Sequence, residues 1–300
     1  MLHLDTIADL RAACDRARSG GQRVGLVPTM GFLHEGHRSL MRAARQSTDF
    51  VVVTIFVNPL QFGAGEDLDR YPRDLSGDLA QCAGEGVDAV FTPSVAEMYP
   101  SGRPLTTVHV DGLTADLCGA ARPTHFDGVA TVVTKLFAIV GTCAAFFGRK
   151  DAQQLAVVTR MADDLNLPVE MIGCPIVRVA DGLAMSSRNA YLDADDRRAA
   201  TVLSRALHEA AAEVVNGARD ADAVRRVLTG LIGTEPRVQL DYAEVVDALD
   251  LAPVDRIDGD VLVAVAANVG RARLIDNMGL SVGSTSVDVD LGVVAQESGS

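Results

Sequence analysis

The turn at residues 34–37 carries two histidines, His34 and His37, that could bind phosphate. It follows the apolar run 24–27 through a glycine-containing string and precedes a helical pattern. A helix N-terminus presents unpaired N–H groups and a partial positive charge, and two imidazoles would complete an anion cradle. A pair of surface histidines is the plain alternative, and a metal pair is another. A zinc-protease helix spaces its histidines four apart, whereas these are three apart. The context favours phosphate.

Two adjacent cations, Arg149 and Lys150, follow Gly148 at the end of another apolar run. The chain has 27 basic and 40 acidic residues, a net charge of −13, so an anionic ligand needs a local basic cluster. A solvated basic pair is the alternative. Gln154 lies one helical turn after Lys150, so the two side chains can face the same cleft.

Ser186, Ser187 and Arg188 form a third polar group, in the string 185–189. Two hydroxyls beside a guanidinium suit a phosphate, because the arginine fork matches oxyanions. A polar linker before a helix is the alternative. The string lies close to the expected domain boundary, and ligand clefts form preferentially between domains.

Amides and further cations follow other apolar runs. Asn58 and Gln61 can both donate and accept hydrogen bonds, which suits a ligand with hydroxyls and a carboxylate. Arg122 and His125 could supply cations to the same cleft. Taken alone, Asn-Pro at 58–59 is an ordinary turn.

The hydrophobic pattern predicts the elements that position these groups. The first half alternates apolar runs with helical patterns, which argues for an α/β fold with a doubly wound, Rossmann-like parallel sheet in a domain spanning 1–176. In such a sheet ligands bind at the carboxyl ends of the strands. The predicted strands are 24–27, 50–57, 89–91, 144–147 and 169–172, and the predicted helices are 36–46, 75–84, 129–140 and 151–165.

The alternation of apolar runs with helical patterns ends at about residue 175. Asp193 can cap a helix that runs to about residue 215, and a second helix is predicted at 222–232. Strands are predicted at 239–246, 261–269 and 271–276. These elements predict a smaller α+β domain spanning 177–283, followed by a loose tail at 284–300.

Composition narrows the class of protein. The acidic balance disfavours nucleic acid and anionic membranes as partners. The five cysteines are scattered and form no Cys-x-x-Cys pair, which indicates reduced thiols. No apolar run reaches the roughly 20 residues that a membrane helix needs. We therefore expect a cytoplasmic protein without nucleic-acid or membrane partners.

Together, five strings resemble the pantoate–β-alanine ligase (pantothenate synthetase) family of the HxGH nucleotidyltransferase superfamily. Each string is modest alone, but all five occur in the family's order. They are Pro-Thr-Met-Gly at 28–31, the histidine turn at 34–37, Phe-Val-Asn-Pro at 56–59, Arg-Pro-Thr-His at 122–125 and the string 181–189.

The resemblance implies an ATP-dependent acid–amine ligase. Pantoate would react with ATP to give pantoyl adenylate and pyrophosphate, and β-alanine would then displace AMP to give pantothenate. Mg²⁺ would accompany ATP, and the enzyme would be a homodimer. Two alternatives stay open: a nucleotidyltransferase acting on a phosphorylated acceptor, and a catalytically weakened nucleotide-binding homologue.

The resemblance also implies roles for individual residues. His37, Lys150, Ser186 and Arg188 would be catalytic. The residues that would contact ATP are Met30, His34, His37, Gly148, Lys150, Asp151, Met185, Ser186, Ser187 and Arg188. Those that would contact pantoate or β-alanine are Met30, Asn58, Gln61, Gln154, Arg122 and His125. The metal ligand is left unassigned.

The chain departs from the family's pattern beside Lys150. The family usually has Gly-Glu-Lys-Asp-aromatic-Gln-Gln, whereas this chain has Arg149 in place of the glutamate and Ala152 in place of the aromatic residue. The first change shifts the local charge by two units, and the second removes a packing group. Either change could misplace Lys150.

Overall fold

The computed structural model describes residues 1–295, and these form two compact units. The first unit contains residues 1–115, 119–149 and 154–174. The second contains the described chain from Pro175 onward together with two short segments, 116–118 and 150–153. Lys150 therefore groups with the second unit, although it falls within the expected first domain, 1–176.

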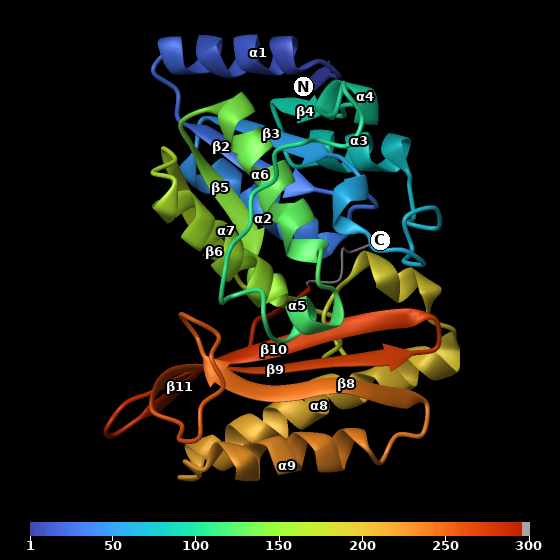
Figure 1. Ribbon diagram of the computed structural model, residues 1–300, viewed down its shortest axis with the longest axis vertical. Helices are drawn as coiled ribbons and strands as arrows, with labels where there is room; N and C mark the ends of the chain where they lie inside the picture. Colours follow the sequence, from blue (N-terminus) through green and yellow to red (C-terminus); the bar gives the residue numbers. More distant parts are fainter. Residues whose placement is uncertain (296–300) are drawn as a thin grey trace. The chain divides into compact units, whose positions relative to one another are not determined.

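A six-stranded sheet forms the centre of the first unit (Figure 1), and every strand pair in it is parallel. The predicted doubly wound α/β fold is confirmed. The first strand, three residues long, was not predicted because so short a run carries no hydrophobic period. In spatial order the strands are β1 (Leu2–Leu4), β4 (Ala89–Phe91), β3 (Phe50–Ile55), β2 (Val24–Thr29), β5 (Cys143–Gly148) and β6 (Val169–Cys174).

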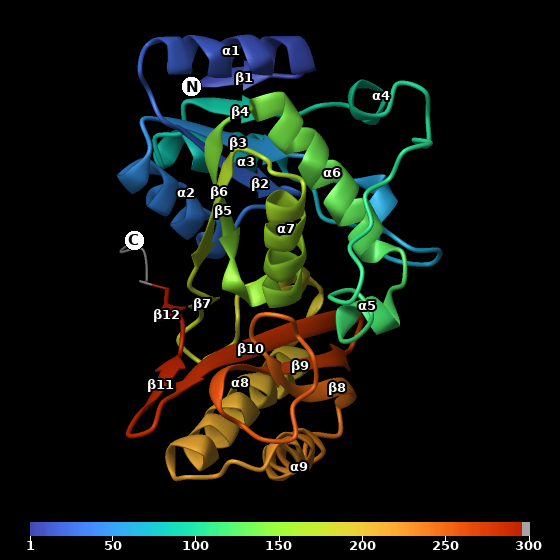
Figure 2. The ribbon, with the colours of Figure 1, turned by 60° about the vertical axis from the view of Figure 1, so that its left-hand side comes forward.

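Helices cover both faces of this sheet. Figure 2 shows α2 on one face and α6 and α7 on the other. Val51, Val52 and Val53 of β3 are all fully buried, as a strand covered on both sides requires. The helices are α1 (Ile7–Ser19), α2 (Glu35–Ser47), α3 (Leu75–Gly84), α4 (Val95–Met98), α5 (Cys118–Ala121), α6 (His125–Val140) and α7 (Ala152–Asp164).

The direction of strand addition reverses at β2. The chain proceeds from β2 to β3 and β4 on one side, whereas β5 and β6 lie on the other side. β2 pairs directly with β5, with Gly25 opposite Ala144. In open parallel sheets ligands bind beyond the carboxyl ends of the strands at such a reversal. β2 leads into the histidine turn and β5 ends at Gly148, so two predicted motifs leave the sheet at this point.

The second unit is built on an antiparallel sheet with the strand order β11-β10-β9-β8, packed against two helices. Alternate residues of β9, such as Val263 and Val265, are buried in one core with α8 and α9. The smaller α+β domain is thus confirmed. Its elements are β7 (Val177–Arg178), α8 (Ala194–Val215), α9 (Ala221–Ile232), β8 (Val238–Asp247), β9 (Gly259–Val269), β10 (Ala272–Val282), β11 (Val287–Asp290) and β12 (Val293–Val294).

Within the segment expected as a loose tail, residues 287–290 and 293–294 form strands. β11 pairs with β10, and β12 pairs in parallel with β7. The strands are short and flanked by glycine and serine, so composition alone suggested a tail, although 287–290 alternates valine and aspartate. Residues 296–300 of that expectation lie outside the described part. Within residues 1–295, no helix is long and apolar enough to cross a membrane.

Candidate active site

The histidine turn begins helix α2 and is closed by its own side chains. His34 is the N-cap residue, and its Nδ1 accepts the Gly36 N–H at 3.1 Å. The His37 Nδ1 accepts the His34 N–H at 3.3 Å. The two ring centroids are 4.1 Å apart. Because each Nδ1 is an acceptor, each neutral ring carries its proton on Nε2. Both imidazoles are therefore Nε2–H donors at the start of a helix.

The acid between the two histidines is neutralised. Glu35 pairs with Arg38 and Arg42, and both arginines also reach Glu85, at the C-terminal end of α3. Glu85 is nearly buried, with 8% of its side chain exposed. Without these arginines the Glu35 carboxylate would repel an anion at the helix start. The network therefore removes that repulsion from the start of α2.

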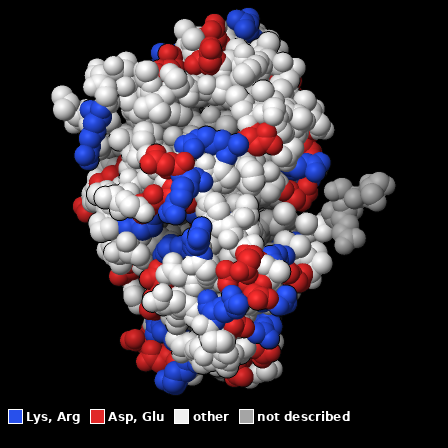
Figure 3. All heavy atoms as spheres, turned by 90° about the vertical axis from the view of Figure 1, so that its right-hand side faces the viewer, with Lys and Arg blue, Asp and Glu red and all other residues white. Residues whose placement is uncertain are grey.

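Arginines also lie beside acids on the surface. The face drawn in Figure 3 carries Lys and Arg side chains next to Asp and Glu. Ion pairs of this kind include Arg45–Asp88 at 2.6 Å and Arg237–Asp196 at 2.9 Å. A surface cation that faces a carboxylate offers less to an anionic ligand. The placement of individual cations, more than net charge, thus decides where such a ligand binds.

A buried carboxylate on α3 supports the chain just before the turn. Asp78 is 2% exposed and accepts the N–H groups of Phe32 at 2.9 Å and Leu33 at 2.7 Å. Burial raises the pKa of this carboxyl, while the two N–H donors oppose the rise. Gly31 adopts φ +82°, and a Cβ there would lie 2.9 Å from an Asp78 oxygen. This support was not predicted, because Asp78 is 46 positions from Phe32.

Replacing Asp78 by asparagine should weaken the turn. The asparagine NH2 group would face the N–H of either Phe32 or Leu33. That buried backbone donor would then have no acceptor. We expect the free energy of unfolding to fall by about 1–3 kcal/mol, measured by urea denaturation, together with a higher KM for ATP. Asp69→Asn, at an exposed position of the same unit, is the control. An unchanged unfolding midpoint for Asp78→Asn would contradict this role.

A second polar group surrounds Gln61, in the short 3-10 turn Pro59–Gln61. The Gln61 Nε2 contacts the Met30 sulfur at 3.1 Å, and its Oε1 accepts from Asn58 Nδ2 at 3.2 Å. Asn58 also donates to the Gly128 carbonyl at 3.0 Å and accepts from the Tyr99 hydroxyl at 2.8 Å. Asn58 is 1% exposed. These bonds fix the Asn58 amide, which in turn orients Gln61.

The Gln61 backbone is held by the predicted cations. Arg122 Nη2 donates to the Gln61 carbonyl at 3.2 Å, and His125 Nδ1 donates to the same oxygen at 2.8 Å. Arg122 also forms an ion pair with Glu66. The structure thus brings Met30, Asn58, Gln61, Arg122 and His125 into one hydrogen-bonded group. Gln154 is half-buried on α7.

The second unit carries most of the remaining predicted phosphate residues. Lys150 and Ser186 are half-buried, and Ser187 is 8% exposed. The Ser186 Oγ accepts the Arg188 N–H at 3.3 Å, which caps the 3-10 turn Ser187–Tyr191. The Asn189 Nδ2 donates to the Ala184 carbonyl at 3.1 Å, a local hydrogen bond that spans residues 185–188.

The chain matches the family model described as pantoate-beta-alanine ligase over residues 3–279. It is 55% identical to the pantothenate synthetase of Pelotomaculum thermopropionicum over 277 residues, 92% of this chain and 98% of that protein. The solved pantothenate synthetase of Thermus thermophilus superposes with a TM-score of 0.88 at 47% identity, covering 92% of this chain and 98% of that one.

The chain belongs to the pantoate–β-alanine ligase family. It is therefore an enzyme, a ligase that joins pantoate to β-alanine with ATP. A further relative, the Francisella tularensis pantoate-beta-alanine ligase, was solved in complex with beta-gamma ATP and beta-alanine. It is 30% identical with a TM-score of 0.75, and the match covers 92% of this chain and 97% of that one.

Arg149, one of the two departures noted in the sequence, packs beside strand β6. Arg149 runs beside Gly173 of β6, where a Cβ would lie 3.4 Å from the arginine Nε. Its positive charge also lowers the pKa of Cys174, against the larger effect of burial, which raises it. Arg149 therefore lies along β6. The absence of a side chain at Gly173 gives it room.

Proposed function

We propose that His34 and His37 bind the phosphates of ATP, with His37, Lys150, Ser186 and Arg188 acting on the reacting groups. The observation that carries this proposal is the hydrogen bonding of the two imidazoles. Both Nδ1 atoms accept backbone N–H groups, so both rings present Nε2–H at a helix N-terminus. Fixed donors of this kind stabilise phosphoryl charge without reorganising during the reaction.

Pantoate is assigned to the group around Gln61. The Gln61 amide is oriented by Asn58, and its backbone is held by Arg122 and His125. An amide fixed in this way can bind a hydroxyl and a carboxylate in a defined pose. The remaining assigned contacts to pantoate or β-alanine are Met30, Asn58, Gln154, Arg122 and His125. The remaining assigned contacts to ATP are Met30, Gly148, Asp151, Met185 and Ser187.

The first step forms a bond between a pantoate carboxylate oxygen and the α-phosphorus of ATP, and breaks the bond from that phosphorus to pyrophosphate. Lys150 and Arg188 would balance the charge that gathers on the leaving pyrophosphate. In the second step the neutral amine of β-alanine attacks the adenylate carbonyl carbon. AMP leaves with the bonding electrons, and the amine nitrogen loses a proton.

Mg²⁺ would enter with the nucleotide. Among residues 1–295, no group of three or more His, Cys, Asp or Glu side chains could hold a metal ion. Mg²⁺ at nucleotide sites is commonly held by the phosphates with few protein ligands, so the residues fit a metal carried by ATP. Such a metal would neutralise phosphate charge.

A homodimer and a cytoplasmic location belong to the same proposal. The homodimer is inferred from the family resemblance. The location is supported by five free, buried cysteines, because thiols stay reduced in the cytosol.

Product analysis tests the proposed chemistry. The enzyme with ATP and pantoate should exchange labelled pyrophosphate into ATP, and added β-alanine should yield AMP and pantothenate in equal amounts. Exchange that requires a phosphorylated acceptor instead would favour the nucleotidyltransferase alternative. ATP binding without exchange would favour the weakened homologue.

A further inference from the structure

The second unit, which carries the predicted ATP contacts Lys150 and Ser186, contains a buried ion pair. Arg178 of β7 binds Asp276 of β10 through two hydrogen bonds, at 2.6 and 3.0 Å, and their side chains are only 3% and 1% exposed. A buried pair of this kind persists only where the other polar atoms of both groups also have partners. Those partners connect it to the predicted site.

The Arg178 guanidinium has an acceptor for each of its five N–H donors. Besides the two bonds to Asp276, it donates to the carbonyls of Leu291 at 3.0 Å, Gly182 at 3.2 Å and Asn277 at 3.2 Å. The remaining carboxylate contact is internal to β10, because Asp276 Oδ1 accepts the Asn277 N–H at 2.8 Å. Asn277 is thus held at both its N–H and its carbonyl.

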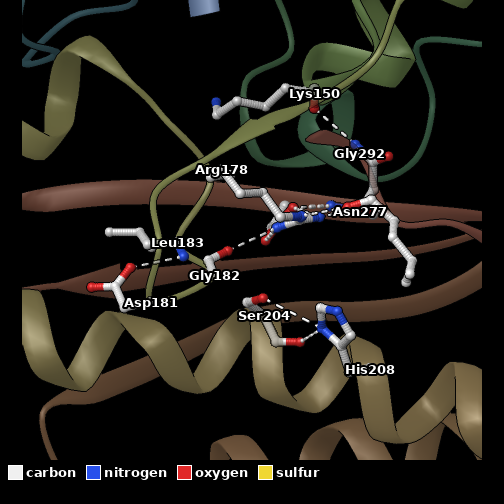
Figure 4. A network of polar contacts seen from close by, with 12 residues as sticks. Lys150, Arg178, Asp181, Gly182, Leu183, Ser204, His208, Asn277 and Gly292 are labelled. Atoms are coloured by element: carbon white, nitrogen blue, oxygen red, sulfur yellow. Dashed lines mark hydrogen bonds and ion pairs between the residues drawn. The ribbon is translucent and has the colours of Figure 1, made fainter. Parts of the chain in front are cut away.

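The Asn277 side chain continues this network to Lys150. Its Nδ2 donates to the Lys150 carbonyl at 2.8 Å. Figure 4 shows the lysine side chain leaving this contact in the opposite direction, with its ammonium at the far end. The hydrogen bond therefore holds the backbone from which the side chain extends, and leaves the ammonium itself to face elsewhere.

A second branch leads toward Ser186. The turn that precedes it is held by Arg178 through Gly182, and the Met185 N–H donates to the Val177 carbonyl at 2.9 Å. Gly182 adopts φ +89°, and a Cβ there would lie 2.8 Å from the Ser204 hydroxyl. The turn therefore has little freedom. Figure 4 shows Gly182 and Asn277 approaching the same guanidinium.

We propose that Asn277 is a positioning residue for Lys150, and that the Arg178–Asp276 pair is the common support of Lys150 and of the chain leading to Ser186. This inference rests on the proposed role of Lys150 in adenylate formation. It also accounts for how a chain with Arg149 and Ala152 beside Lys150 keeps that lysine in place. A contact from β10, distant in sequence, fixes the backbone there.

The test replaces the Asn277 donor and separates the two chemical steps. Asn277→Leu keeps a similar volume but removes the hydrogen bond to Lys150. We expect pantoate-dependent exchange of pyrophosphate into ATP to slow by about tenfold to hundredfold, because small misplacements of a catalytic group have effects of this size. The second step is measured by rapidly mixing β-alanine with preformed enzyme-bound adenylate. The rate of this attack should fall by less than about threefold, since pyrophosphate has already left.

Asn268→Leu is the matched control. Asn268 is an exposed asparagine on β9, opposite Arg273 of β10, and its replacement should leave both steps unchanged. If Asn277→Leu does not fold, as judged by its thermal transition, Asn277→Ser replaces it with the same expected split. A shortened serine cannot reach the Lys150 carbonyl.

Two failures are distinguishable. Equal slowing of both steps by Asn277→Leu, or no slowing of either, would overturn the positioning role while leaving the proposed function intact. Full exchange activity in Lys150→Ala would instead overturn the proposed role of the lysine, on which the inference rests.

Discussion

Lys150→Ala is expected to reduce pyrophosphate formation by on the order of a thousandfold, because it removes a preplaced cation from the charge that develops on the leaving group. The folded state should survive, since the Lys150 atom that joins the buried network is its backbone carbonyl, which alanine retains. The measurement is pantoate-dependent pyrophosphate exchange, with thermal unfolding as the check on structure.

The control for this prediction removes another cation, on the helix that follows Lys150 in the chain. Arg160→Ala, at an exposed position of α7 paired with Asp164, should leave exchange unchanged. Lys150→Arg retains the charge on a longer, planar group and should recover only part of the activity. Near-normal exchange in Lys150→Ala would remove the lysine from the first step.

Gly128→Ala is expected to have the next largest effect, through packing. A Cβ at Gly128 of α6 would lie 2.3 Å from the Leu60 carbonyl oxygen and 2.5 Å from the Gln61 nitrogen. Either α6 or the Pro59–Gln61 turn must move. We expect the free energy of unfolding to fall by about 1–3 kcal/mol. The Kd of pantoate should rise by roughly tenfold or more, because a loss of about 1.4 kcal/mol in binding is tenfold.

Isothermal titration of pantoate and urea unfolding measure these two effects separately. Gly230→Ala is the control, because a Cβ at that position of α9 meets nothing within 4 Å. It should leave pantoate binding unchanged and stabilise the helix slightly. Unaltered pantoate affinity in a folded Gly128→Ala enzyme would show that Gln61 does not depend on the close approach of α6.

Local pattern was sufficient for much of the architecture. The continuous apolar run of β3 predicted a strand buried on both faces, and the strand–helix alternation predicted the parallel sheet. Short elements escaped this reasoning. β1 has three residues and β12 has two, so neither contains a period, and each exists because a distant strand supplies its hydrogen bonds.

Motif residues were likewise identified without their supports. His34 and His37 stand out because a turn, two imidazoles and a helix start occur within one string. Tyr99 orients Asn58 from 41 positions away, and Glu85 reaches Arg38 from 47 positions away. An isolated tyrosine or glutamate in a sequence carries no sign of such a partner, so these residues were missed.

The sequence by itself determined the fold class, the family and the side chains available for chemistry, because these depend on residue type and short-range spacing. Tertiary structure alone decided how those side chains are held. Asp78 fixes the turn before His34, Gly128 admits the backbone of Gln61, and Asn277 holds the Lys150 carbonyl. Each contact joins segments far apart along the chain, and hydrogen bonds and steric fit at that range depend on coordinates rather than on local sequence.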